Sequence, residues 1–174
     1  MMRKVRFGAA ISLDGYIAGP QGEYDWIVQD PEMNFTAMMA DFDTFLIGRK
    51  TFDLMVRTKQ DKPVKGIDYI VFSRTLRAED YPRVRMERDA EPVVRALREK
   101  PGKDIAVFGG GELFRSLLGE GLVDSVEVGV IPVLLGGGIP LLPAPADRAR
   151  LKLLHQRVYE KTGIVRLEYE VVRG

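Results

Sequence analysis

Cysteine is absent from this sequence of 174 residues, and histidine occurs once, as His155. The lack of cysteine excludes disulfide bonds, thiolate metal sites and a cysteine nucleophile. A lone histidine leaves no partners for a histidine-rich metal site or for a histidine-based catalytic triad. We therefore expect a protein without a resident metal.

The chain also lacks an excess of charge of either sign. Lysine and arginine number 26 and the acidic residues 25, which gives a net charge of +1 at pH 7. No polyelectrolyte partner is implied, so we expect no binding of nucleic acid. Hydrophobic residues make up 45% and charged residues 29%, as is usual for a globular protein. The length suits one domain, residues 1–174, with a core of its own.

Membrane and export signals are missing as well. The apolar run behind Arg3, Lys4 and Arg6 is short and ends at Asp14, so we expect no signal peptide. Residues 128–146 carry no charge, but four prolines and four glycines prevent a lipid-facing helix there. We therefore expect a cytoplasmic protein without a membrane partner. We also expect part of this uncharged stretch to be buried between two subunits.

Short apolar runs alternate with helical patterns through most of the chain. The runs predict buried strands at 5–11, 44–47, 69–72, 84–86, 105–108 and 123–133. Helices are expected behind Asp30-Pro31, Gly48, Asp89 and Gly111, with Phe35, Met38, Met39 and Phe42 facing inward on the first. Two arms at 151–159 and 164–172 predict a closing β-hairpin. The fold class is therefore α/β, a mixed sheet with helices on its faces.

Three glycines, Gly109 to Gly111, separate one predicted strand from the helix behind it. Glycine allows a ligand to approach the backbone, and a helix N-terminus suits phosphate. The dinucleotide pattern GxGxxG would need glycine where Phe114 stands, and the lysine of a P-loop is missing. On its own, the turn therefore supports either a phosphate site or nothing more than a tight connection.

Two further strand ends share this chemistry. Gly48–Thr51 follows the strand at 44–47, and Ser73–Thr75 follows the strand at 69–72. Ligands of parallel α/β sheets bind at the carboxyl ends of the strands. Arg49 and Arg74 would supply guanidinium groups of the kind that binds phosphate. Together, the three loops predict a site for a ligand with several phosphates.

Five segments occur along the chain in a recognisable order: Ile11-Ser-Leu-Asp-Gly-Tyr-Ile-Ala18, Leu46-Ile-Gly-Arg-Lys-Thr-Phe52, Ile70-Val-Phe-Ser-Arg-Thr75, Val107-Phe-Gly-Gly-Gly-Glu-Leu113 and Leu122-Val-Asp124. With these segments the chain resembles the dihydrofolate-reductase-like superfamily. Within it, the chain is most similar to the reductase domain of the riboflavin-pathway deaminase–reductase. The resemblance implies a three-layer α/β/α fold with a mixed, mainly parallel eight-stranded sheet and an antiparallel C-terminal hairpin.

The resemblance implies NADPH as the cofactor, lying across the carboxyl edge of the sheet. Gly48–Thr51 would hold the pyrophosphate, Ser73 and Arg74 the adenosine 2′-phosphate, and Gly109–Leu113 the nicotinamide side, while 12–19 would form a mobile loop over the nicotinamide. The implied cofactor residues are Ala10, Ile17, Gly48, Arg49, Lys50, Thr51, Ser73, Arg74, Thr75, Gly109, Gly110, Gly111, Glu112 and Leu113.

The activity implied is hydride transfer to a pyrimidine- or pteridine-like small molecule, of the 5-amino-6-(5-phosphoribosylamino)uracil reductase type, in a homodimer. Asp14 and Glu32 are the catalytic candidates, although an Asp–Gly turn and a helix start are their ordinary explanations. Tyr16, Trp26 and Phe35 are the candidates for substrate contact, and core packing is the ordinary role of a tryptophan.

Two residues depart from the riboflavin reductases. Gly8 stands where those enzymes have a lysine, and Phe108 stands where they have a glutamate. Two alternatives therefore stay open: an activity like that of dihydrofolate reductase, and a non-catalytic nucleotide-binding module. A flavin- or metal-dependent enzyme has no support from any residue.

Overall fold

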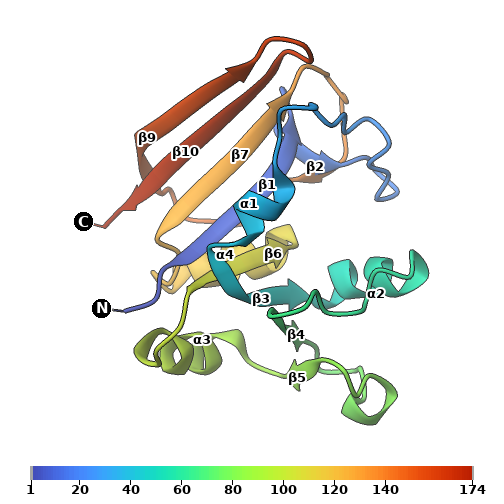
Figure 1. Cartoon of the computed structure of the whole chain (residues 1–174), viewed down its shortest axis with the longest axis vertical. Coiled ribbons are helices and arrows are strands. Elements are labelled where there is room, and N and C mark those ends of the chain that lie inside the picture. The colour runs from blue at the N-terminus through green and yellow to red at the C-terminus, as the bar shows by residue number, and fades with distance from the viewer. Residues whose placement is uncertain (1, 174) are drawn as a thin grey trace.

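An eight-stranded mixed sheet runs through the computed structural model, which describes residues 2–173 (Figure 1). Its strand order is β5-β4-β3-β6-β1-β7-β10-β9. The first six of these strands are parallel to one another, and β10 is antiparallel to both β7 and β9. The bounds are β1 Val5–Ser12, β3 Phe42–Gly48, β4 Asp68–Phe72, β5 Arg85–Glu87, β6 Asp104–Gly109, β7 Ser125–Ile131, β9 Arg150–Tyr159 and β10 Ile164–Val172.

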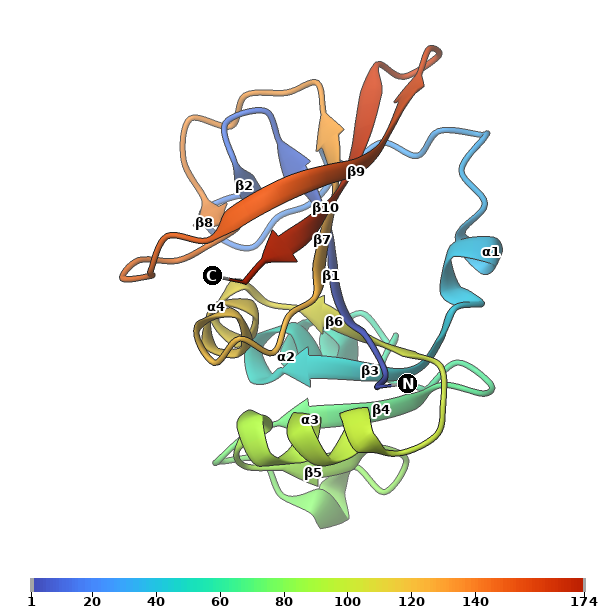
Figure 2. The same cartoon turned by 90° about the vertical axis from the view of Figure 1, so that its left-hand side faces the viewer.

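Helices pack on both faces of this sheet and complete three layers. Helices α3 and α4 bury their apolar sides in one large cluster with β1, β3, β6 and β7, whereas α2 buries Phe52 and Met55 in a second cluster. Figure 2 shows α1 and α4 on opposite sides of β1. The helices are α1 Phe35–Met39, α2 Arg49–Arg57, α3 Ala90–Glu99 and α4 Gly111–Gly119, with a 3-10 turn at Ala78–Asp80.

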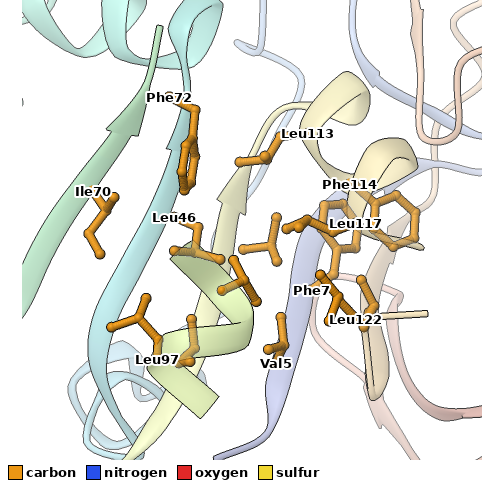
Figure 3. Packing of buried hydrophobic residues seen from close by; sticks show 14 of the residues in the cluster. Val5, Phe7, Leu46, Ile70, Phe72, Leu97, Leu113, Phe114, Leu117 and Leu122 are labelled. Carbon is orange, nitrogen blue, oxygen red and sulfur yellow. The ribbon is translucent and has the colours of Figure 1, made fainter. Parts of the chain in front are cut away.

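The larger cluster packs helix α4, which follows the glycine turn at the end of β6, against the sheet. Phe7 of β1 stacks on Phe114 of α4 with ring centroids 3.9 Å apart, and Leu117 lies beside them, fully buried (Figure 3). Burial of such side chains contributes roughly 1.5–3 kcal/mol each. The contact therefore holds the start of α4 against the central strand, next to the carboxyl edge.

A helix was predicted to start at Asp30-Pro31, and this prediction is wrong both about where the helix begins and about which of its residues face the core. Helix α1 begins at Phe35, where Asn34 caps it by accepting the Ala37 N–H at 2.9 Å. The buried Asp30 carboxylate instead accepts the Glu32 N–H and the hydroxyl of Thr162, which lies in the distant hairpin turn. This tertiary contact makes 30–33 a turn, and it leaves Phe35 45% exposed.

The remaining inward residues of that prediction are divided between two elements. Met38 and Met39, both in α1, are half-buried. Phe42 is also half-buried, but it begins β3 and does not belong to the helix. The five-residue helix is thus too short to present an apolar stripe of its own.

A second, two-stranded sheet lies inside segments predicted as irregular. Strand β2, Tyr16–Ala18, pairs with β8, Ile139–Pro140. Strands of two or three residues leave no periodicity to read. A Cβ on Gly138 would lie 2.2 Å from the Ala18 carbonyl oxygen, so this pairing needs glycine there. Among residues 2–173 no helix is long and apolar enough to cross a membrane.

Candidate functional site

Three loops meet at the carboxyl edge of the parallel strands, as their sequence positions predicted. Strands β3, β4 and β6 are neighbours and parallel, and they end at Gly48, Phe72 and Gly109. The following loops, 48–51, 73–75 and 109–111, therefore share one edge. Strand β1 ends at the same edge, at Ser12, where the loop of residues 12–19 begins.

The first and third loops touch each other through their glycines. A Cβ on Gly48 would lie 3.4 Å from the Gly109 carbonyl oxygen and 3.5 Å from the Gly110 nitrogen. A Cβ on Gly110 would lie 3.2 Å from the Thr51 hydroxyl oxygen. A side chain at Gly110 would therefore need a small shift of Thr51, whereas one at Gly48 would make ordinary contacts. We call the surface formed by 48–51 and 109–111 the glycine surface.

Two helices begin at the glycine surface without side-chain caps. Helix α2 follows Gly48 and helix α4 follows Gly110, and neither N-cap residue has a side chain to bind the free N–H groups. Each helix N-terminus leaves unpaired N–H donors and a partial positive charge. The surface therefore presents two sets of donors suited to a phosphate chain.

The basic loop behind β4 completes this edge. Ser73 is buried, and its hydroxyl oxygen accepts the N–H groups of Thr75 at 3.2 Å and Leu76 at 3.0 Å, which fixes a tight turn. Arg74 projects from this turn, and its side chain is 79% exposed while it pairs with Asp89 at 2.9 Å. Arg49 is also exposed and pairs with Asp53. Both guanidinium groups are accessible to a ligand.

Asp14 fastens the loop that follows β1. Its carboxylate accepts the Ser12 hydroxyl at 2.6 Å, the Leu135 N–H at 3.1 Å and the Gly136 N–H at 2.8 Å. The hydrogen bond from Ser12 and those from the two backbone N–H groups hold the pKa of Asp14 below its ordinary value of 3.8, against a smaller opposing effect of desolvation. Asp14 is therefore ionised at neutral pH and joins two loops.

Glu32 lies beside the C-terminal hairpin. It is exposed and pairs with Arg157 at 3.2 Å and Lys161 at 3.9 Å, so its carboxylate serves neither a helix start nor the glycine surface. Trp26 donates its indole N–H to the Glu23 carbonyl and packs against a small cluster around Ile131.

The other predicted contact residues lie near the end of β1. Ala10 is in β1 itself, and Tyr16 and Ile17 are in β2, all half-buried. Strand β2 follows the turn after Ser12, whose hydroxyl accepts the Tyr16 N–H at 3.0 Å. These three residues therefore share the edge of the sheet with the glycine surface, whereas Phe35 stands apart on α1.

One face of the sheet carries Gly8 and Phe108, the two departures from the riboflavin reductases, together with a charged pair that the sequence patterns did not single out. Gly8 is exposed although β1 is an inner strand, and Phe108 of β6 is 43% exposed. Glu127 of β7 accepts two hydrogen bonds from Arg166 of β10, both at 2.8 Å. In a sequence, charged residues within a strand ordinarily indicate a face that is exposed to solvent. The Glu127–Arg166 pair is therefore recognised only from the order of the strands in the sheet.

A charged recess among the described residues lies elsewhere. It has a volume of about 570 Å³ and is lined by mixed charges from the amino ends of the parallel strands and from the hairpin, including Lys4, Asp124 and Glu170. It is far along the strands from the glycine surface, and it lacks uncapped helix starts. We therefore place the candidate site at the carboxyl edge. No group of three or more acidic or histidine side chains within 2–173 is arranged to hold a metal ion.

Comparison with known proteins identifies the fold and the family. The fold is that of the dihydrofolate-reductase-like α/β reductases: dihydrofolate reductase from Enterococcus faecalis, solved in complex with NADP(H) and RAB-propyl, superposes with a TM-score of 0.72 at 16% identity, over 99% of this chain and all of that one. The model of the RibD C-terminal domain matches residues 3–165. The chain belongs to the RibD C-terminal domain family, a family of reductase-like domains.

Three further proteins illustrate the relationship. The uncharacterized protein YyaP of Bacillus subtilis (strain 168) is 35% identical over 96% of this chain and 94% of its own. A putative riboflavin biosynthesis protein from Shewanella sp. PV-4 gives a TM-score of 0.83 at 25% identity, over 99% of this chain and all of that one. The deaminase/5-amino-6-(5-phosphoribosylamino)uracil reductase of Thermotoga maritima gives 0.71 at 20% identity, over 98% of this chain and 57% of that one.

Proposed function

We propose that this protein is an NADPH-dependent reductase. It transfers hydride to a pyrimidine- or pteridine-like small molecule, most closely in the manner of a 5-amino-6-(5-phosphoribosylamino)uracil reductase. The observation that carries the proposal is the meeting of two uncapped helix N-termini at the glycine surface, next to the exposed Arg74. Two sets of free N–H donors and a nearby guanidinium match a pyrophosphate and a 2′-phosphate.

The residues present fit this cofactor. Gly110 packs tightly on Thr51, where a Cβ would lie 3.2 Å from the hydroxyl oxygen, and neither N-cap residue, Gly48 or Gly110, carries a side chain that could cover the backbone N–H groups of the helix starts. Arg74 and Ser73 would face the adenosine 2′-phosphate from the neighbouring strand end. NADPH, when bound, supplies the hydride, so the protein's task is to hold the two partners in line.

The loop of residues 12–19 would exclude water from the nicotinamide. It leaves β1 at the same edge, and Asp14 ties it to the backbone of Leu135 and Gly136. Strand β2 within this loop also pairs with β8, so the loop would open together with residues 139–140. Opening would admit the substrate, and closure would exclude water before hydride transfer.

A non-catalytic nucleotide-binding module is the second candidate. Glu32, the acid that the resemblance would bring to the substrate, is engaged by Arg157 and Lys161 on the hairpin. Asp14 is held in its ionised form and is thus a poor proton donor at neutral pH. A module would bind NADPH at the same edge but would reduce nothing.

Two measurements test the proposal in order. Calorimetric titration with NADPH, accompanied by Trp26 fluorescence, is expected to show binding at micromolar concentrations. Absence of any signal at millimolar NADPH would overturn both candidates. If NADPH binds, loss of its absorbance in the presence of oxidised pyrimidines, pterins and dihydrofolate separates a reductase from a module and a riboflavin-type from a folate-type enzyme.

A further inference from the structure

Strand β9 forms an open edge of the main sheet. It is the last strand in the sheet order, and it stands at the outer left of Figure 1 with no element beyond it. Within residues 2–173, the backbone of 150–158 bonds to no segment other than β10. The strand is ten residues long, and all but its last residue are exposed. Its outer N–H and C=O groups are therefore free to pair with a further strand.

The two faces of β9 differ in chemistry. Side chains alternate between the faces of a strand, so Arg150 and Lys152 share one face. The other face carries Leu151, Leu153 and Val158, which are 44%, 47% and 53% exposed. An added strand would thus meet cations on one face of the sheet and an uncovered apolar row on the other.

Strand β10 shows which kind of strand fits β9. Its segment Leu167–Val171 reads Leu-Glu-Tyr-Glu-Val, an alternation of acidic and apolar residues. Glu170 stands opposite Lys152 on one face, and Tyr169 stands opposite Leu153 on the other. Opposite charges and apolar pairs that face one another across two strands stabilise the pairing. The same side chains of β9 also lie beside its outer edge, so a second strand with this alternation would find equivalent partners there.

A second copy of β9 lacks the chemistry that this edge requires. Residues 150–159 contain three basic side chains, one histidine and no acid. Two β9 strands paired edge to edge could therefore form no pair of opposite charges in any register, and like charges that face one another are destabilising. Positive charge on an edge strand is a common means of preventing such self-association. The same charge favours an acidic strand, which would also bury the apolar face.

We propose that β9 is a docking site for a partner protein that adds an extended segment of alternating acidic and large apolar residues to the sheet. The backbone of that segment bonds to the outer edge of β9. Its acidic side chains face Arg150 and Lys152, and its apolar side chains cover Leu151, Leu153 and Val158. The site is separate from the proposed reductase site, because β9 stands at the opposite end of the strand order from β3 and β4.

The test uses a fluorescein-labelled peptide with the sequence of residues 165–172, Val-Arg-Leu-Glu-Tyr-Glu-Val-Val, which has the required alternation. Fluorescence anisotropy is expected to show that it binds to the full chain below millimolar concentration. A peptide of the same composition without the alternation, and one with both glutamates replaced by lysine, should bind at least about tenfold more weakly.

Two protein variants separate the charge of β9 from charge in general. Lys152→Glu is expected to weaken the glutamate peptide about tenfold, since an attractive cross-strand pair becomes a repulsive one. Lys65→Glu, the same change in an exposed loop before β4, is the matched control and should have no effect. Lys152→Glu should also bind the lysine peptide more tightly than the unmodified protein does, a gain that misfolding cannot produce.

Hydrogen exchange locates the binding site. Amides within 150–158 are expected to gain protection when the glutamate peptide is added. The proposal is overturned if Lys152→Glu binds this peptide as the unmodified protein does, if the non-alternating peptide binds equally well, or if no peptide binds at millimolar concentration. It is also overturned if Leu153→Glu converts a dimeric protein into a monomer, because a second copy would then occupy β9.

Discussion

Lys50 Nζ lies 3.2 Å from Glu112 Oε1, and this ion pair joins the first turn of α2 to the first turn of α4. Both side chains are more than half exposed, so the pair itself adds little to stability. Its position matters more, because it spans the glycine surface on which we place the pyrophosphate. A bound phosphate and Glu112 would compete for the same ammonium group.

Glu112→Gln is therefore expected to strengthen NADPH binding. Removal of the carboxylate frees Lys50 and takes a negative charge away from a helix N-terminus where an anion binds. An exposed pair is worth about 0.2–1 kcal/mol, so the dissociation constant should fall by up to about fivefold. Calorimetry measures it, with Glu120→Gln at the other end of α4 as the charge-matched control. Weaker binding by Glu112→Gln would place the pyrophosphate elsewhere.

Arg74→Ala should weaken NADPH far more than NADH. The change removes a charge-assisted contact worth about 1.5–3 kcal/mol, which corresponds to roughly a 10- to 150-fold loss for the cofactor with the 2′-phosphate. Asp89→Asn is expected to act in the opposite direction, because Asp89 now holds this guanidinium at 2.9 Å. Arg77→Ala serves as the control, since Arg77 is also a largely exposed arginine, paired with Glu79. An equal loss of NADPH and NADH would refute this role for Arg74.

The hydrogen bonds of Asp14 predict a dependence of stability on acid. A folded-state pKa below the ordinary value of 3.8 means that ionised Asp14 contributes stability above pH 3.8, and that this contribution is lost as the pH falls through the lowered pKa. Asp14→Asn should thus lower the urea midpoint at pH 7, and the difference from the unmodified protein should shrink in acid. A difference that is unchanged from pH 7 to pH 2.5 would contradict this interpretation.

Assembly as a homodimer remains a prediction that sedimentation can check. Part of the uncharged stretch, Val128 and Ile131, is buried within the chain itself, whereas Leu134 is 69% exposed. On edge strand β9, Leu153 and Val158 are also about half exposed. We expect a particle of twice 19.5 kDa at micromolar concentration. Leu134→Glu and Leu153→Glu, compared with each other, then report which surface is buried; a monomeric unmodified protein would refute the prediction.

Local patterns were sufficient wherever an element is defined by its own residues. Strand β4 was predicted from the apolar run of Tyr69 to Phe72, and the structure buries all four of these residues. Helices α2, α3 and α4 were predicted from spacing and from the residues at their starts. The order of strands and loops then located the carboxyl edge, since parallel strands present their ends together.

Prediction failed where a distant residue decides the local structure. Asp30 is a residue type that often caps a helix, but its carboxylate accepts the hydroxyl of Thr162 in the hairpin turn, 132 residues away. The helix therefore begins later, at Phe35. Glu32 was predicted to lie in the first turn of that helix, and it lies instead beside Arg157 of the hairpin. Strand β2 exists only because β8 pairs with it.

The sequence by itself determined an α/β chain, the strands that end in glycine or basic loops, and hence the edge suited to a phosphorylated cofactor. Those features depend on residues close together in the chain, and they remain legible without coordinates. Only the tertiary structure decided what stands around Gly8. Glu127 pairs with Gly8, and Val107 with the preceding Phe7, because the strand order is β6-β1-β7, and that order joins residues about a hundred positions apart. No local spacing encodes such a neighbourhood, because it arises when separate strands pair in one sheet.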